Sequence, residues 1–403
     1  MYSAELPSNT AATMRLPPAL AGALALARRR FSSSSSSPAL SSLSSSTSSS
    51  PWRCAVPPGR KLAIVQVKWW HSEVFGTLLE YARACGHEIV VYHRAGHATS
   101  ALPLYERLFS PLDVRDPGAF RGEHERYDAV FLTTPDDDID EGFRKSQQHR
   151  TVYAAHLTHP KFLHRWHTLR LYMTPLAGFP YAIPVFAAGQ PVLPASAREK
   201  TIVMIGTVHD GSNYEVAKVL AFARAALADG WRFVVFTRHW GTGEQPPFGT
   251  EMVQDASTEA VYERLRRCSF VLIYPGANSW YHSDRVTGAL PLAISVGTPV
   301  VTTALLADLY GFSAADGFVA ADGAEAMALA AGDAGHSATR FAALIEGIAA
   351  LRARLLANNV AVIESVLRGV PAVAKAMAAA GSGGDIMPLA DGFHKRQTPE
   401  LGC

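Results

Sequence analysis

The amino-acid sequence predicts an α/β protein with two Rossmann-like domains, each built on a doubly wound parallel sheet. Three observations support this prediction. Short apolar runs of strand length alternate with segments whose apolar residues recur at helical spacing. The alternation stops at a proline-rich stretch, residues 175–194, and restarts at residue 201. The chain has 403 residues, whereas a single hydrophobic core stops growing near ~250–300 residues. We therefore expect an N-terminal domain over residues 61–196 and a C-terminal domain over residues 197–380.

The first half contains four continuous apolar runs, a pattern that is typical of strands buried on both faces of a parallel sheet. The expected strands are 61–67, 88–93, 128–133 and 151–156. A helix is expected over residues 72–84, because its apolar residues recur at helical spacing and Gly86 follows where helices commonly end. Each strand runs into polar residues, which indicates a ligand-binding edge at the carboxyl ends of the strands.

The second half repeats the pattern. The expected strands are 201–205, 232–237, 269–274 and 300–303. The expected helices are 213–228, 258–267 and 284–295, followed by C-terminal helices at 338–367 and 371–380. Ser212 and Glu215 have the spacing of a capping box, which predicts the start of the first of these helices. Residues 381–403 are expected to form a disordered tail.

Residues 1–60 have a different composition from the rest of the chain. Glu5 is their only acidic residue, residues 28–30 are arginines, and residues 32–50 are mostly serine. So little apolar surface predicts a disordered segment. Arginine- and serine-rich segments poor in acid are typical of organelle transit peptides, which would place the protein in a plastid or mitochondrion. The alternatives are a plain disordered tail on a cytoplasmic protein and a secretory signal built on residues 19–27.

Composition excludes several classes of function. The chain has 37 basic and 35 acidic residues, so there is no electrostatic footprint for nucleic acid or an anionic membrane surface. No apolar run approaches the ~18 residues needed to cross a bilayer. Cys54, Cys85, Cys268 and Cys403 lie far apart with no C-x-x-C pair. We therefore expect no disulfide framework, no zinc ribbon and a reducing compartment.

Residues 275–303 carry the most informative motif, which ends in Gly-Thr-Pro-Val-Val at residues 297–301. This segment resembles the nucleotide-sugar-binding segment of GT-B-fold glycosyltransferases, especially the retaining family-four-type enzymes. The resemblance implies two domains that face each other across a cleft, with the donor on the second domain and the acceptor on the first. Asp284 falls where this family has its first acidic residue. The second acid would fall at Leu292, and the family's basic pair is replaced by a loop with only His209.

Candidate donor-binding residues follow the strands of the second half. A helix N-terminus favours an anion, a glycine lets a phosphate approach the backbone, and arginine or hydroxyl groups can bind phosphate oxygens. The candidates are Gly206, Thr207, His209, Ser212, Arg238, Tyr274, Arg285, Thr287 and Gly288. Several of these also have a purely structural interpretation. Ser212 is suited to capping a helix and the two arginines to solvated surface positions, and Asp284 is likewise suited to capping a helix.

The first half is rich in histidine between residues 149 and 167. His156 and His159 follow an expected strand and are candidates for acceptor positioning or proton transfer. The alternatives are ordinary surface histidines or a metal site, and we predict no metal because the resemblance implies metal-independent chemistry. Trp69 and Trp70 follow the first strand and are suited either to stacking on a sugar or to an interdomain contact.

These observations predict a hexosyltransferase-like glycosyltransferase that moves a sugar from a nucleotide-sugar donor to a glycan, lipid or small-molecule acceptor. We expect retention of anomeric configuration, Asp284, His156 and His159 as catalytic residues, and no cofactor beyond the donor substrate. The alternative is a catalytically inactive GT-B-like module that binds a glycan, a nucleotide or a partner. An epimerase of the same architecture is a third possibility. A dehydrogenase is disfavoured, because no G-x-G-x-x-G follows either first strand.

Overall fold

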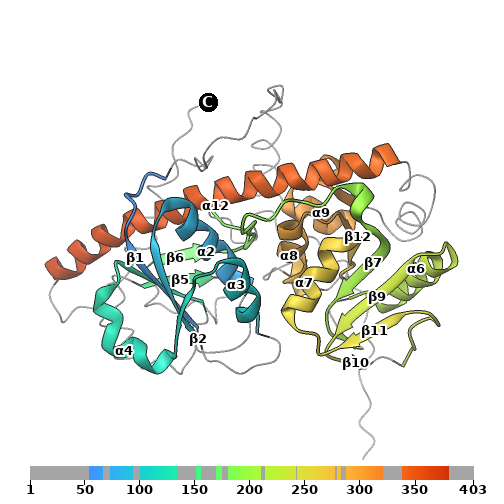
Figure 1. Ribbon diagram of the computed structural model, residues 1–403, viewed down its shortest axis with the longest axis horizontal. Coiled ribbons are helices and arrows are strands. Elements are labelled where there is room, and N and C mark those ends of the chain that lie inside the picture. Colours follow the sequence, from blue (N-terminus) through green and yellow to red (C-terminus); the bar gives the residue numbers. More distant parts are fainter. Residues whose placement is uncertain are drawn as a thin grey trace, which may run out of the picture. The chain divides into compact units, whose positions relative to one another are not determined.

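The computed structural model describes residues 54–66, 73–93, 100–133, 151–155, 169–174, 180–209, 214–241, 243–276, 279–282, 287–320 and 338–380. Figure 1 shows the helices and strands that these residues form. Several predictions fall outside the described residues and stay predictions. They concern the transit-peptide-like composition before residue 54, the tail after residue 380, the two tryptophans, and the site residues His156, His159, Ser212, Asp284 and Arg285.

The first sheet contains six strands, all parallel, in the order β3-β2-β1-β4-β5-β6. The strands are β1 (Lys61–Gln66), β2 (Glu88–His93), β3 (Asp113–Arg115), β4 (Ala129–Leu132), β5 (Thr151–Ala155) and β6 (Leu169–Tyr172). The chain therefore moves outward from β1 to one edge, returns, and moves outward from β4 to the other edge. This order defines a doubly wound sheet whose direction switches between β1 and β4.

The second sheet also has six parallel strands, in the order β11-β9-β7-β12-β13-β14. The strands are β7 (Glu199–Ile205), β9 (Arg232–Thr237), β11 (Glu251–Gln254), β12 (Cys268–Ile273), β13 (Val300–Thr302) and β14 (Phe318–Ala320). A separate two-stranded pair joins β8 (Val208–His209) to β10 (Trp240–Gly241). Counted along the chain, the strand order repeats that of the first sheet, and its switch point lies between β7 and β12. The predicted fold class is confirmed, whereas the domain boundaries stay predictions.

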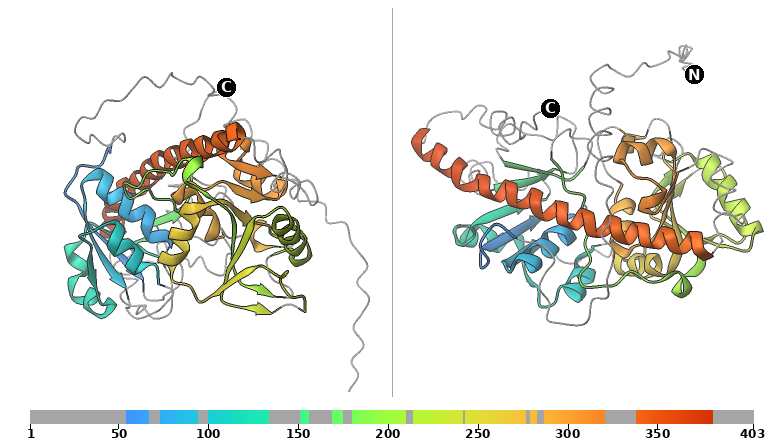
Figure 2. Two further views of the ribbon diagram at one scale, coloured as in Figure 1. Left: turned by 45° about the vertical axis from the view of Figure 1, so that its right-hand side comes forward. Right: turned by 90° about the horizontal axis from the view of Figure 1, so that it is seen from above.

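Helices cover both faces of each sheet, because alternate strand residues point to opposite faces. In the second sheet, Val203 and Val234 face a core shared with α7 (Thr258–Arg267) and α8 (Ala289–Val296). Met204 and Val235 face the other core, which contains α6 (Val216–Ala228). Figure 2 shows α6 on one side of this sheet and α7 and α8 on the other.

The remaining elements are short, apart from one long helix. They are α2 (Glu73–Cys85), α3 (Leu102–Leu108), η1 (Pro117–Ala119), α4 (Phe120–Glu123), η2 (His124–Arg126), η5 (Ala195–Ala197), η6 (Trp280–His282), α9 (Ala304–Tyr310), η7 (Ala314–Asp316) and α12 (Ala338–Ala380). In the first sheet, α2 and α3 pack on one face and α4 on the other. No described helix has the length and apolar character needed to span a membrane.

Several predicted helices have different bounds in the structure. The helix expected from residue 213 begins at Val216 with Glu215 as its N-cap residue, and the helix expected from residue 284 begins at Ala289. The two C-terminal helices are one helix, α12, which continues through Pro371. A proline removes one backbone hydrogen bond but does not necessarily end a helix whose flanking turns are stable.

The proline-rich stretch expected as a linker connects β6 to β7, and its residues 182–186 are buried, whereas residues 189–198 are exposed or partly exposed. Ala182, Ile183 and Val185 are fully buried. A buried irregular backbone must find hydrogen-bond partners outside a sheet. Asn359 of α12 binds both backbone groups of Ile183, and the Ser295 hydroxyl accepts a hydrogen bond from the N–H of Phe186 at 3.0 Å. Side chains therefore replace a strand neighbour along this connection.

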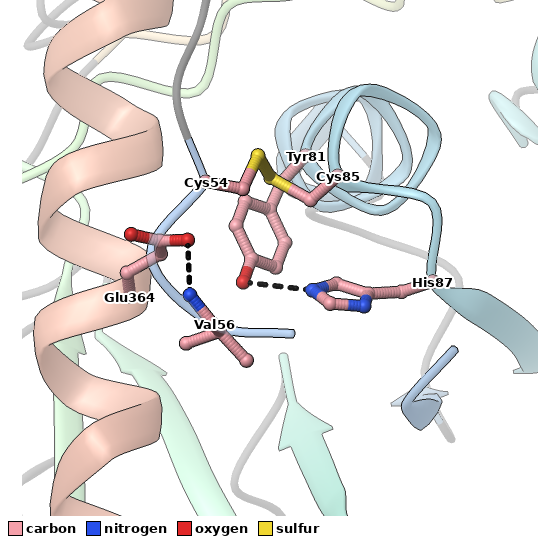
Figure 3. Close-up of a disulfide and its surroundings, with 6 residues drawn as sticks. All are labelled: Cys54, Val56, Tyr81, Cys85, His87 and Glu364. Atoms are coloured by element: carbon pink, nitrogen blue, oxygen red, sulfur yellow. Dashed lines mark hydrogen bonds between the residues drawn. A yellow bond between two sulfur atoms is a disulfide. The ribbon is translucent and has the colours of Figure 1, made fainter. Parts of the chain in front are cut away.

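Two of the four cysteines form a disulfide, which corrects the expectation of no disulfide framework. Cys54 and Cys85 are bonded, with their Cα atoms 5.6 Å apart (Figure 3). The bond joins the segment before β1 to the last residue of α2. The cysteines are 31 residues apart in sequence, and a spacing of this kind does not identify a pairing, which depends on the tertiary fold. Cys268 is a buried free cysteine.

Candidate functional site

The candidate site lies at the switch point of the second sheet, at the carboxyl ends of β7 and β12. In open α/β sheets ligands bind in the crevice outside these ends, where the strand order reverses. Gly206 directly follows β7, and Tyr274 directly follows β12. The sequence predicted both as donor-binding residues, and the sheet order places them beside each other, because β7 and β12 are neighbours.

Tyr214 occupies this switch point. Its hydroxyl donates a hydrogen bond of 2.6 Å to the carbonyl oxygen of Ile205, the last residue of β7. Its backbone forms an antiparallel bridge with Pro275 beyond β12. The ring lies against Gly206, where a Cβ would sit 2.6 Å from Tyr214 Cε2 and where φ is +149°. A side chain at residue 206 would therefore collide with this tyrosine, and the positive φ also favours glycine.

Thr287 and Tyr281 join Tyr214 from the loop that precedes α8. The hydroxyl of Tyr214 interacts with both of their side chains, and burial raises its pKa well above the ordinary value for tyrosine. The rings of Tyr214 and Tyr281 meet edge to face at 6.2 Å. Thr287, which is 3% exposed, also accepts a hydrogen bond at its hydroxyl from the N–H of Ala289 at 3.3 Å. Gly288 is exposed and helical, with φ of −61°.

Lys218 brings a positive charge to the same edge and was missed in the sequence analysis. It is an exposed residue in the first turn of α6, and its ammonium lies 5.8 Å from the centroid of the Tyr274 ring. The N–H of Glu215, just before this helix, donates to the carbonyl oxygen of Tyr274 at 3.2 Å, which ties the start of α6 to the end of β12. The sequence signal for this residue was a lysine in the first turn of the helix that follows the loop after β7.

The other predicted donor residues that the structure describes lie at the same edge of the sheet. Thr207 is exposed and follows Gly206, and Arg238 is exposed and follows β9. His209 belongs to β8, which pairs with β10 beyond the end of β9. Gly206, Tyr274 and Thr287 are brought together around Tyr214, and Thr207 and Arg238 lie along the same edge.

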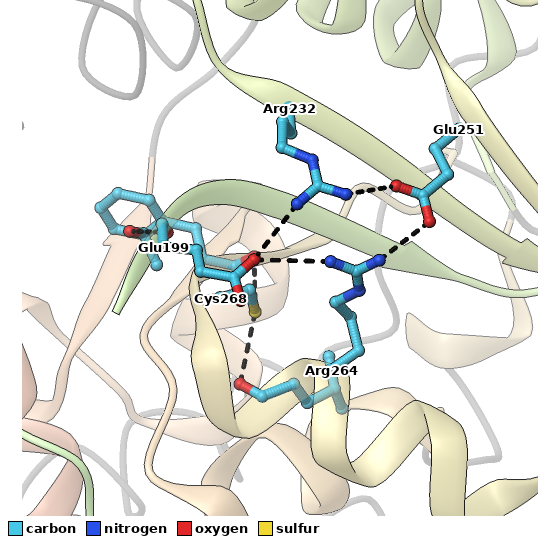
Figure 4. Close-up of polar contacts among 8 residues, drawn as sticks. Glu199, Arg232, Glu251, Arg264 and Cys268 are labelled. Atoms are coloured by element: carbon cyan, nitrogen blue, oxygen red, sulfur yellow. Dashed lines mark hydrogen bonds and ion pairs between the residues drawn. The ribbon is translucent and has the colours of Figure 1, made fainter. Parts of the chain in front are cut away.

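The opposite edge of the second sheet carries a cluster of ion pairs. Glu199 and Arg232 begin β7 and β9, and Glu251 begins β11. Arg264 of α7 binds Glu251 at 2.8 Å and Glu199 at 3.4 Å, and Arg232 binds the same two carboxylates at 2.8 and 3.4 Å (Figure 4). These charges join the amino ends of the strands, so their role is structural.

The Gly-Thr-Pro-Val-Val motif also lies at this opposite edge. Gly297 ends α8 in the left-handed conformation, with φ of +71°. The Arg198 guanidinium donates at 2.7 Å both to the carbonyl oxygen of Gly297 and to the Thr298 hydroxyl. Burial lowers the pKa of Arg198 to about 10, so it remains charged at neutral pH. The motif on which the family resemblance depends is therefore a packing feature of the fold.

The switch point of the first sheet is polar and buried. Gln66 ends β1 and Thr133 follows β4, and both side chains are fully buried. The Thr133 hydroxyl donates to Gln66 Oε1 at 2.7 Å. His93 ends β2 at 2% exposure, and its ring meets Phe75 edge to face at 5.7 Å. The sequence analysis did not single out these residues, because they are the last residues of apolar runs.

Solved structures similar to this fold include named glycosyltransferases. AviGT4, a glycosyltransferase involved in avilamycin A biosynthesis, aligns with a TM-score of 0.51 and 16% identity over 78% of this chain and 98% of its own. HepE from Anabaena, solved with UDP and glucose, aligns with a TM-score of 0.49 and 11% identity over 79% of this chain and 100% of its own. SnogD from Streptomyces nogalater aligns with a TM-score of 0.42 and 16% identity over 75% and 98%.

No protein-family model matches the chain, and no curated protein matches it in sequence. The similarity to AviGT4 supports the fold, which is the GT-B-like pair of six-stranded parallel sheets. At 16% identity it establishes the fold alone.

Proposed function

We propose that this protein is a glycosyltransferase whose nucleotide-sugar donor binds at the carboxyl edge of the second sheet. The placement of Lys218 carries the proposal. An exposed ammonium lies in the first turn of α6, above the ring that follows β12 and beside the switch point. This is the edge where doubly wound sheets bind nucleotides. The similarity in fold to a named glycosyltransferase supports the same assignment.

The chemistry of glycosyl transfer suits a cation at this edge. As the bond between the sugar and the diphosphate breaks, negative charge develops on the departing phosphate oxygens, and a fixed positive charge stabilises it. Lys218 supplies such a charge, while Thr207 and Arg238 extend the polar edge. In this proposal His156, His159 and Asp284 act on the acceptor and the donor sugar, with retention of configuration and without a metal, as the family resemblance implies.

A second candidate function is a binding module without catalysis. Two observations favour it. Tyr214 fills the switch point and bonds to the end of β7, so a diphosphate needs this side chain to move before it can approach Gly206. Leu292, which stands where the family has its second acid, packs against the apolar core.

Titration of the purified protein with UDP, GDP, ADP and CDP in a calorimeter tests donor binding. We expect one nucleoside diphosphate to bind, and we expect Lys218→Ala to weaken its binding by about tenfold, or ~1.4 kcal/mol. Lys200→Ala is the matched control. Lys200 is also exposed, but it lies near the start of β7, at the opposite edge of the sheet, where it pairs with Asp229. Absence of binding to all four nucleotides, or equal weakening by both substitutions, contradicts the proposed site.

Hydrolysis of the matching nucleotide-sugar separates the two candidate functions. A transferase releases the nucleoside diphosphate slowly in the absence of acceptor, and Asp284→Asn reduces that release. A binding module binds the nucleotide but leaves the nucleotide-sugar intact.

A further inference from the structure

Three potential metal ligands that are not part of the candidate donor site lie close together. The two sulfur atoms of Cys54 and Cys85 and a carboxylate oxygen of Glu364 lie within 4.8 Å of one another. They come from three separate segments, namely the chain before β1, the end of α2 and the middle of α12 (Figure 3). Two sulfurs and one carboxylate are a ligand set that zinc accepts once the sulfurs are thiolates.

The group is largely buried and its carboxylate is held in place. Cys85 is 6% exposed and Glu364 is 3% exposed, while Cys54 is only partly buried. The backbone N–H of Val56 donates to Glu364 Oε1 at 3.0 Å (Figure 3). Such a hydrogen bond orients a carboxylate in the way that outer-sphere partners orient metal ligands. The partly exposed Cys54 gives reagents in solution a route to the sulfur pair.

The electrostatic surroundings accommodate an exchange of the disulfide for a metal. Arg60, Arg368 and Glu364 all act electrostatically on the Tyr81 hydroxyl beside the disulfide, so the carboxylate shares its surroundings with two cations. A disulfide has no net charge. A divalent cation with two thiolates has none either, so it imposes no new charge on Glu364 and its neighbours.

We propose that Cys54, Cys85 and Glu364 form a redox-gated zinc site. Reduction breaks the sulfur–sulfur bond. A dithiol reductant supplies two electrons and two protons, leaves two thiols on the protein, and becomes a disulfide itself. Binding of Zn²⁺ then releases two protons to solvent as the thiols become thiolates. A small-molecule disulfide such as oxidised glutathione reverses this step: it takes up two electrons from the thiolates and two protons from solvent and becomes two thiols. The sulfur–sulfur bond of the protein re-forms, two ligands are lost and the ion is released.

The chemistry of the ligands selects the metal. Thiolates favour zinc over magnesium and calcium, which prefer oxygen ligands. Three protein ligands leave a fourth tetrahedral position for water or another group. The bound ion would link the same three segments as the disulfide and Glu364 do now, so both redox states hold the start of the described chain against α2 and α12.

The test compares the full-length protein in its two redox states. All samples carry Cys403→Ser, so that this cysteine adds no thiol that could bind zinc. One sample is left oxidised, and the other is reduced with a phosphine that is then removed under argon. Zn²⁺ is titrated against a chromogenic chelator. We expect the reduced protein to bind about one ion per chain and the oxidised protein none. Zinc binding of equal strength in both states, or in neither, overturns the proposal.

Substitutions then identify the ligands in the reduced protein. Cys85→Ser is expected to abolish binding. Glu364→Gln keeps an acceptor for the Val56 N–H, but a neutral amide is a poor zinc ligand. Loss of a residue that only supports a metal ligand typically weakens metal binding about 10–100-fold, so we expect loss of a direct ligand to weaken zinc binding at least about tenfold. Cys268→Ala removes the buried free cysteine and is expected to leave binding unchanged. Co²⁺ in place of zinc reports thiolate ligands through its sulfur-to-metal absorption.

The comparison of the oxidised and reduced protein leaves Cys54, Cys85 and Glu364 unchanged. It therefore remains decisive even if one of the ligand variants fails to fold. Unchanged affinity in Glu364→Gln, or loss of binding in Cys268→Ala, refutes this assignment of ligands. Because the site is separate from the second sheet's carboxyl edge, its failure would leave the donor-binding proposal untouched.

Discussion

Asn359 binds both backbone groups of Ile183, a residue 176 positions earlier in the chain. Its Oδ1 accepts from the Ile183 N–H at 3.0 Å, and its Nδ2 donates to the Ile183 carbonyl oxygen at 2.7 Å. Both residues are buried, at 2% and 0% exposure. One amide side chain thus gives the connecting segment the pair of hydrogen bonds that a neighbouring strand would otherwise supply.

We expect Asn359→Ala to lower the free energy of unfolding by about 2–4 kcal/mol, because it leaves two buried backbone groups without these partners. Urea unfolding followed by circular dichroism measures the change. Asn358→Ala is the matched control, since Asn358 donates a single exposed hydrogen bond to the Tyr181 carbonyl oxygen. Its effect is expected to stay below about 1 kcal/mol. Equal losses in the two variants would contradict the role assigned to Asn359.

Loss of the disulfide is expected to destabilise the protein through the unfolded chain. For a loop of 31 residues, the chain-entropy model gives about 3–4 kcal/mol at 25 °C. Cys85→Ala, measured by urea unfolding in the presence of EDTA so that no metal compensates, tests this value. A variant that unfolds at the wild-type urea concentration would show that the cross-link does not restrict the unfolded state.

Tyr92 makes stability sensitive to alkaline pH. Its hydroxyl lies 2.7 Å from that of Tyr127 and donates to Glu123 at 3.0 Å. Burial is the main cause that raises its pKa, and the hydrogen bond to Tyr127 is the next largest. The folded protein therefore keeps the proton while the unfolded chain loses it near pH ~10. The stabilisation is present below pH ~10 and falls by up to ~1.4 kcal/mol per pH unit above it.

Urea unfolding at a series of pH values from 8 to 11 measures this dependence. Tyr92→Phe removes the titrating group, so its stability should decline less steeply than that of the wild type above pH ~10. Parallel declines would show that Tyr92 does not cause the sensitivity.

Cys268 should resist alkylation in the folded protein. It is fully buried, its Sγ donates to the Leu265 carbonyl oxygen at 3.3 Å, and burial raises the pKa of its thiol to about 12. Iodoacetamide reacts with thiolates, so at mildly alkaline pH we expect no label on Cys268 until guanidinium unfolds the chain. Peptide mapping by mass spectrometry follows the label. Rapid labelling of the native protein would show that this thiol is accessible.

The sequence predicted the central strands well, because parallel strands buried on both faces appear as continuous apolar runs. The expected strand 88–93 is β2, and 232–237 is β9. The missed strands are short or carry charges that obscure the pattern, as in β3 (DVR), β6 (LRLY) and β11 (EMVQ). Such strands are defined by hydrogen bonds to a neighbour rather than by their own composition.

The candidate site was less predictable, because its main occupant comes from elsewhere in the chain. Thr287 and Gly288 were expected to open a helix beneath a phosphate, yet the Thr287 side chain contacts Tyr214 and the helix begins at Ala289. Nothing in local spacing places Tyr214 over Gly206, and nothing local pairs Cys54 with Cys85. Contacts between residues on different elements become visible only when the sheets are assembled.

The position of α12 in the chain has a consequence for biosynthesis. Asn359 and Glu364 bind backbone groups of Ile183 and Val56, and both leave the ribosome long after those residues. The strands of the first sheet can pair as soon as they have been synthesised. The backbone groups of Val56 and Ile183 gain their α12 partners only after the last quarter of the chain has been made. A nascent chain stalled before α12 would therefore expose these unpaired segments to chaperones and proteases.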